Sequence, residues 1–175
     1  MWVLSARSDS ATRLEVRSGR PMTRVEVGVS PSGAAIARGR LWIVTAGRLG
    51  KRPAVGMLHR LNARTGRPVK PALKLGGFPS DVAVSPGSVW VAVSLADLIG
   101  RLDADGSRRL YAVEDDRRKE YASPISIAAD GTGAWVSNLV AASVQRLEPA
   151  PRPPAKPKAK AGAKPAPDRP PTGTR

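Results

Sequence analysis

Residues 79–106, PSDVAVSPGSVWVAVSLADLIGRLDADG, decide the fold because they hold most of one repeat unit. Pro79 opens the unit, Trp90 follows after eleven residues, and an Arg-Leu pair begins after another eleven, at Arg101. Turn-forming dipeptides, Pro86-Gly87 and Asp105-Gly106, separate the apolar runs. This pattern predicts short strands joined by tight turns.

Three landmarks recur in register along the chain. The tryptophans are Trp2, Trp42, Trp90 and Trp135. The prolines that precede a tryptophan by eleven residues are Pro31, Pro79 and Pro124. The Arg-Leu pairs begin at Arg13, Arg60, Arg101 and Arg146. The pair at Arg60 comes seven residues late, which predicts a loop insertion at residues 47–53.

The repeat predicts four strands per unit, at residues 81–84, 89–94, 99–103 and 109–113 in the third unit. The second strand is apolar at successive positions, as expected for a strand covered on both faces. We therefore predict an all-β fold, a β-propeller of about 3.5 to 4 four-stranded blades in a partial or open ring. An immunoglobulin-type sandwich also has short strands, but it would not repeat these landmarks.

The predicted blades lie at residues 1–27 (partial), 28–76, 77–120 and 121–149 (partial). The two partial blades overlap in their strands and do not complete one another, so the ring stays open. Open blade edges favour self-association, and an upstream coding region is expected to supply missing blades.

The last segment, residues 150–175, is predicted to be disordered because it has almost no large apolar side chain to bury. The chain has a formal net charge of +15, and this Pro/Ala/Lys-rich tail carries seven basic residues against Asp168. We expect non-specific, salt-sensitive polyanion contact through the tail. A composition biased toward Arg, Ala, Gly and Pro explains the charge without any binding role. The polyanion-contacting side chains are assigned to Lys156, Lys158, Lys160 and Lys164.

The blade pattern Pro-Ser…Val-Ala-Val…Val-Trp-Val-Ala…Arg-Leu-Asp…Gly resembles the bacterial YVTN/NHL-type propellers, and among them the actinobacterial group that includes virginiamycin B lyase. The resemblance covers Met1 to Pro149. It implies the fold more than any one function, because such propellers sense, scaffold, bind ligands and occasionally catalyse. Many relatives are extracytoplasmic, but no signal peptide or transmembrane segment is recognisable here, and the compartment stays open.

The lyase resemblance implies a catalytic histidine and a metal ion. The only histidine, His59, falls on a predicted third strand away from the axial end, where propeller sites form. We therefore predict a structural histidine, no catalytic residue, no metal site and no cofactor. The chain also has no cysteine, so thiolate chemistry is excluded. The acid-rich residues 114–120 lack the ligand spacing of a calcium loop.

The candidate ligand-binding residues lead into the first strands, where loops of adjacent blades converge. They are Ser80, Asp81, Tyr121 and Ser126. The competing interpretation of Asp81 is that it caps its own turn. The sequence favours a non-enzymatic interaction or ligand-sensing module with a protein or small ligand at the blade-end loops. The alternatives are a lyase-related enzyme and a truncated propeller fragment without independent function.

Overall fold

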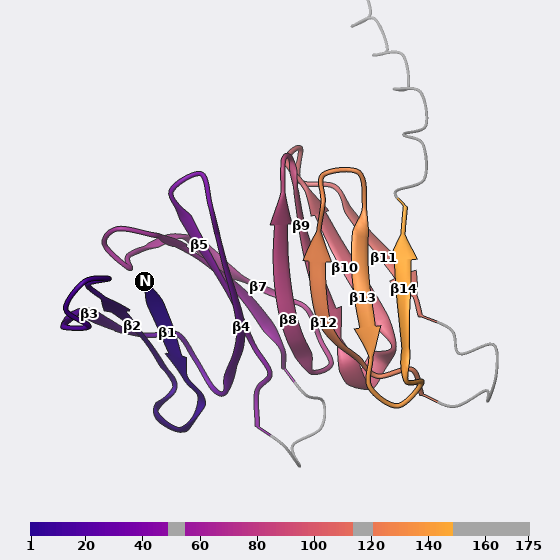
Figure 1. Cartoon of the computed structure of the whole chain (residues 1–175), viewed down its shortest axis with the longest axis horizontal. Coiled ribbons are helices and arrows are strands. Elements are labelled where there is room, and N and C mark those ends of the chain that lie inside the picture. The colour runs from indigo at the N-terminus through magenta and orange to yellow at the C-terminus, as the bar shows by residue number, and fades with distance from the viewer. Residues whose placement is uncertain (49–54, 114–120, 149–175) are drawn as a thin grey trace, which may run out of the picture.

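The computed structural model describes residues 1–48, 55–113 and 121–148, and it arranges them in four antiparallel sheets (Figure 1). The first sheet holds β1 (Trp2–Ser5), β2 (Ser10–Leu14) and β3 (Pro21–Glu26). The second holds β4 (Pro31–Ala37), β5 (Arg40–Thr45), β6 (Met57–Asn62) and β7 (Pro68–Lys74). The third holds β8 (Pro79–Ser85), β9 (Ser88–Val93), β10 (Leu98–Asp103) and β11 (Arg108–Ala112). The fourth holds β12 (Pro124–Ala129), β13 (Ala134–Asn138) and β14 (Ser143–Leu147).

Each sheet is a meander in which consecutive strands pair, so we call the sheets blades 1 to 4 in chain order. The inner strands β4, β8 and β12 lie side by side, and the blades stack face to face behind them (Figure 1). Two single-turn 3-10 helices serve as connections: η1 (Ala6–Ser8) joins β1 to β2 in blade 1, and η2 (Ser94–Ala96) joins β9 to β10 in blade 3. The prediction of an all-β fold with propeller blades in a partial or open ring is confirmed, with sheets of three, four, four and three strands.

The strand register explains why tryptophan and arginine keep their spacing. In every blade the tryptophan faces the arginine of the Arg-Leu pair on the adjacent strand. The guanidinium carbon of the arginine lies over the indole at 5.4 Å for Arg60 on Trp42, 5.0 Å for Arg101 on Trp90 and 5.7 Å for Arg146 on Trp135. The offset of eleven residues is therefore the length of one hairpin. In blade 2 a longer connection between β5 and β6 accounts for the seven extra residues.

The hydrophobic core forms between blades, where the tryptophan-bearing faces of blades 1, 2 and 3 are each covered by the next sheet. Trp90 is 1% exposed, and the cluster around it includes Ile127 and Val136 from blade 4. Trp42 packs in the same way against Val82 and neighbouring valines of blade 3. All six residues of β9 are buried, as the uninterrupted apolar run predicted. Apolar area removed from water between sheets is thus the main stabilising contribution.

One expectation about the tryptophans is wrong. Equivalent burial between blades is expected for Trp42, Trp90 and Trp135, but Trp135 is 47% exposed. The opposite face of β13 packs on blade 3 through Val136, so the face of Trp135 looks outward. No described sheet covers that face, and the repeat position alone does not bury the side chain.

Replacing Trp90 with Ala should lower the free energy of unfolding by about 3–5 kcal/mol, because it empties a large site between two sheets. The equivalent change Trp135→Ala is the matched control and should cost only about 1–2 kcal/mol, since half of its surface is already in water. Urea unfolding followed by circular dichroism measures both. Equal losses for the two variants would contradict burial by the next blade.

Candidate functional site

The inner strands begin with the same local structure in three blades. β4, β8 and β12 each start at a proline, and a register shift follows at once. Because proline has no N–H to donate, it is tolerated at the first position of a strand. The shift places Gly33, Asp81 and Ser126 at equivalent positions. Each pairs with the second-last residue of the following strand. These three residues therefore form one row across the adjacent inner strands.

Asp81 is bound on both carboxylate oxygens. Its Oδ2 accepts hydrogen bonds from Ser126 Oγ at 2.9 Å and from the N–H of Ile127 at 3.0 Å. Its Oδ1 accepts one from the N–H of Val82 at 2.8 Å. Gly33 lies so close on the other side that an added Cβ would stand 2.7 Å from the Cα of Asp81. The predicted ligand residue Asp81 thus joins two blades, and its local bond lies within β8 rather than in a turn.

Ser80 has a similar role. Its hydroxyl donates to the carbonyl oxygen of Pro124 in the next blade at 2.9 Å. Ser32, one blade earlier, donates to the carbonyl of Pro79 at 2.7 Å. A Pro-Ser pair therefore ties each of these inner strands to the following one. We call the hydrogen bonds of Ser32, Ser80, Asp81 and Ser126 the inner-strand contacts.

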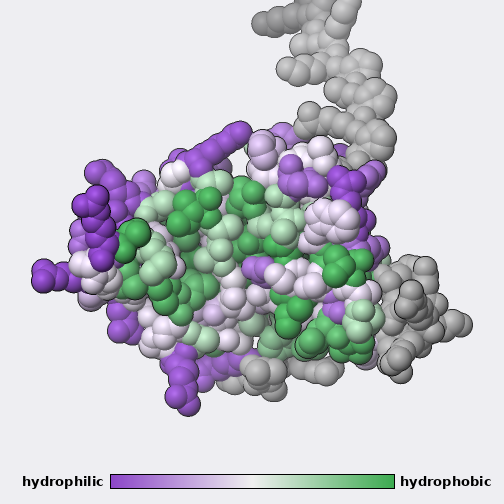
Figure 2. All heavy atoms as spheres, in the orientation of Figure 1, coloured by the Kyte–Doolittle hydropathy of each residue, from purple (hydrophilic) through white to green (hydrophobic). Residues whose placement is uncertain are grey.

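Tyr121 stands apart from the other three predicted residues. It is 71% exposed and precedes β12, without a hydrogen bond to them among the described residues. Other exposed apolar side chains lie on the connections at this same end of the blades: Leu95 in η2, and Leu139 and Val140 after β13. Figure 2 shows hydrophobic residues gathered along the lower edge, beneath β12 and β13, where this end of blade 4 lies in Figure 1.

Sequence reasoning missed two aspartates at the same end. Asp9 and Asp97 follow the short helices η1 and η2 and adopt positive φ. Asp9 Oδ1 accepts from the N–H of Ser30 at 2.9 Å, and Asp97 Oδ1 accepts from the N–H of Ser123 at 2.8 Å. Both aspartates stand seven residues after their tryptophan. That offset is the signal that would have found these links between successive blades.

His59 lies on β6, the third strand of blade 2, as predicted. Its Nε2 is 3.2 Å from Thr45 Oγ1 on the neighbouring strand. Burial lowers its pKa, because the charged imidazolium loses hydration there. Among the described residues no group of three or more His, Asp or Glu side chains could hold a metal ion. The acid-rich residues 114–120 and the tail lysines lie outside the described residues.

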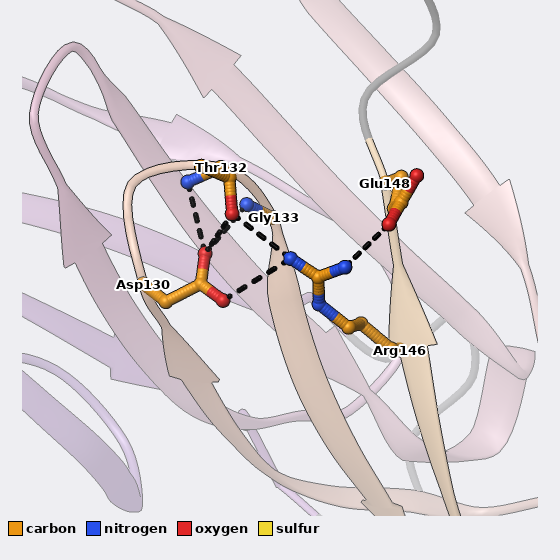
Figure 3. A network of polar contacts seen from close by, with 5 residues as sticks. All are labelled: Asp130, Thr132, Gly133, Arg146 and Glu148. Carbon is orange, nitrogen blue, oxygen red and sulfur yellow. Dashed lines mark hydrogen bonds and ion pairs between the residues drawn. The ribbon is translucent and has the colours of Figure 1, made fainter.

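A polar network closes the turn between β12 and β13 (Figure 3). Asp130 accepts from Thr132 Oγ1, from the N–H of Thr132 and from the N–H of Gly133, at 2.8–2.9 Å. These bonds and the nearby guanidinium of Arg146 lower the pKa of Asp130 to about 2. Arg146 also pairs with Glu148. The network fixes an arginine at the end of the blade opposite to the inner-strand contacts.

A cavity of about 740 Å³ opens between blades 2 and 3, also toward the opposite end. Its floor is apolar and includes Trp42, Leu58 and Val89. Its rim carries five basic side chains and two aspartates. These are Arg38, Arg40, Arg60, Lys70, Arg108, Asp103 and Asp105. We call this cavity the basic groove.

Comparison with known proteins supports the fold and no particular activity. No protein-family model matches the chain, and no curated protein sequence matches it. Solved structures do match. A chain in a crystal structure of a nidogen/laminin complex is 11% identical, with a TM-score of 0.62 over 84% of this chain and 54% of that one.

A functionally unknown protein from Desulfotomaculum acetoxidans is 20% identical, with a TM-score of 0.60 over 90% of this chain and 49% of its own. The PQQ-bound aldose sugar dehydrogenase from Streptomyces coelicolor, a β-propeller, is 17% identical, with a TM-score of 0.52 over 73% of this chain and 45% of its own. The fold is an incomplete β-propeller. The chain spans about half the length of the structures it matches.

The predicted resemblance is confirmed at the level of the fold. A streptogramin B lyase is also a structural neighbour, at 13% identity and a TM-score of 0.48, and this likeness carries nothing about activity. The YVTN/NHL and actinobacterial relationships stay predictions, as do the blade boundaries. No helix in the described part of the chain is long and apolar enough to cross a membrane.

Asp81→Ala should lower the free energy of unfolding by about 1–2 kcal/mol, because it leaves the N–H of Ile127 and the hydroxyl of Ser126 without their acceptor. The exposed Glu26, which lies on β3, provides the control Glu26→Ala, with an expected change within about 0.5 kcal/mol. Thermal or urea unfolding measures both. An unchanged stability in Asp81→Ala would show that the carboxylate does not hold the blades together.

Proposed function

We propose that this chain is a non-enzymatic propeller module that binds a partner protein at the end of the blades where the inner strands begin. The observation that carries the proposal is the exposure of four apolar or aromatic side chains on the connections at that end: Leu95, Tyr121, Leu139 and Val140. Exposed apolar and aromatic side chains gathered at one place are typical of protein–protein contacts.

The inner-strand contacts support this use because they hold neighbouring loops in fixed relative positions. Asp81 and Ser80 bind groups of blade 4, and Asp97 binds the N–H of Ser123, two residues after Tyr121. A surface that is ordered before binding loses less conformational entropy on association. The polar residues predicted as ligand contacts would thus act mainly by positioning the apolar loops around them.

Two further observations favour binding over catalysis. His59, the residue on which the lyase alternative depends, lies within β6 of blade 2 against Thr45, whereas these apolar side chains belong to blades 3 and 4. The nidogen/laminin match is a propeller-like chain solved in a complex, which is consistent with a role in protein contact. The tail, with its predicted polyanion contacts, adds a second and non-specific mode of association to the proposal.

The proposal predicts that Tyr121→Ala and Leu139→Ser weaken binding of a partner isolated by affinity capture and then purified, each by about tenfold or more. Val16→Ser removes an equally exposed apolar side chain from the turn after β2, at the other end of its blade, and should leave affinity unchanged. Isothermal titration calorimetry measures all four proteins. Equal affinities would place the contact elsewhere.

Self-association is a second proposal, carried by the two uncovered blade faces. The Trp135 face of blade 4 matches the Trp90 face that blade 4 itself covers. Blade 1 exposes Met1 and Val3 on its free face. Val3 is equivalent to Ile43, the residue of blade 2 that packs on blade 1. The two ends thus present opposite halves of the contact that repeats inside the chain, so one copy fits onto the next.

Light scattering of the purified chain should show masses above that of the monomer, increasing with concentration. Trp135→Glu should shift the population toward monomer, because covering that face would then remove a carboxylate from water and would no longer bury the indole. Leu110→Glu, on the outer strand β11, provides a control with the same charge change and should not. A strictly monomeric, cooperatively unfolding wild-type chain would overturn the proposal.

A further inference from the structure

Arg60 differs from the arginines at the same position in the other blades. Arg101 pairs with Asp103 at 2.7 Å, and Arg146 pairs with Asp130 and Glu148. In blade 1, Arg13 donates to the carbonyl oxygen of Arg64 at 2.6 Å. Arg60 lies over Trp42, but within the described ranges it has neither an ion-pair nor a hydrogen-bond partner.

The sequence shows why Arg60 lacks a carboxylate. The residue two positions after the arginine is Glu15, Asp103 and Glu148 in the other blades, but in blade 2 it is Asn62. The side-chain oxygen of Asn62 accepts from the N–H groups of Arg64 and Thr65, at 2.9 and 3.1 Å, so it shapes its own turn. The neutral amide keeps the turn and leaves the charge of Arg60 uncompensated.

Arg60 lines the basic groove, where other cations add to its charge. Arg38, Arg40, Lys70 and Arg108 also line it, and none of them has an ion-pair partner in the part of the chain that the structure describes. These side chains come from both walls, because Arg108 belongs to blade 3 and the others to blade 2.

The two aspartates of the groove do not cancel this excess. Asp103 is already paired with Arg101 and also accepts from Ser88 Oγ at 2.8 Å. Asp105 accepts from the N–H of Ser107 at 3.0 Å and from its hydroxyl at 2.7 Å. Five cations against two engaged carboxylates leave the groove positive. Around its apolar floor, an anion would be less hydrated and more strongly attracted than at an open surface.

We propose that the basic groove binds a small organic anion, with its carboxylate or phosphate at Arg60 and its apolar ring against the half-buried Leu73 and Val84. The volume of about 740 Å³ lies within the usual range for small-molecule sites. The anion takes the place that Asp103 and Glu148 occupy beside the equivalent arginines. This site is separate from the loops of the proposed partner contact, so either proposal can fail without the other.

The experiment uses 1-naphthyl phosphate and 1-naphthoate as probes, titrated into the full chain by calorimetry in about 0.15 M salt, where exposed charges are screened. At least one probe should bind, and the stronger of the two identifies the preferred anionic group. Neutral 1-naphthol and inorganic phosphate should each bind much more weakly, because each lacks one half of the recognised chemistry.

Arg60→Gln should weaken binding of the preferred probe about tenfold or more, the effect of removing one charged hydrogen bond. Arg24→Gln removes an equally positive but distant side chain on β3 and should change the affinity less than about twofold. Lys70→Gln, on a different strand of the groove, tests the site independently if Arg60→Gln fails to fold. Absence of binding by both probes, or equal losses in the groove variants and in Arg24→Gln, would overturn the proposal.

Discussion

The structure depends on one constraint: the face of each sheet that carries its tryptophan must be covered by the next sheet. A three- or four-stranded meander has no core of its own, so its apolar side chains leave water only between neighbours. Trp90 satisfies this requirement completely and Trp135 does not. The stacking of blades and the apolar character of the second strands both follow from it. The exposed tryptophan at one end has the same origin.

A second set of interactions gives the stack its alignment. Hydrophobic burial is non-directional and would allow neighbouring sheets to slide. The bonds from Ser32 and Ser80 to proline carbonyls, and from Asp81 to the N–H of Ile127, fix one inner strand relative to the next. Ser80, Asp81 and Ser126, which the sequence predicted as ligand contacts, therefore have a structural role here. Ser32, Ser80, Asp81 and Ser126 each already have a hydrogen-bond partner in an adjacent blade.

The sequence predicted the fold well because repetition makes local signals reinforce one another. The spacing of Trp90 and Arg101 equals the length of one hairpin, and the longer spacing of Trp42 and Arg60 reflects a longer hairpin. Both features could be inferred from the sequence. What could not be read is which groups meet across blades. Asp81 and Ser126 are separated by 45 residues and come together only through stacking. The exposure of Trp135 likewise depends on what lies beyond its sheet, and the repeat position carries no information about that.

The most informative positions are those where one repeat unit carries a different residue from the other units. In blade 3 the acidic residue two positions after the arginine, Asp103, forms an ion pair with Arg101. When blade 2 replaces that acid with Asn62, the turn survives through the side-chain oxygen and the packing of Arg60 on Trp42 survives as well. The turn and the packing of the arginine on its tryptophan are therefore present with either residue, but the ion pair exists only with the acid. What changes is the electrostatic potential of the space between blades 2 and 3. In a repeat built from similar units, a change that keeps the turn and the tryptophan packing but removes an ion pair beside a cavity is where binding specificity can arise.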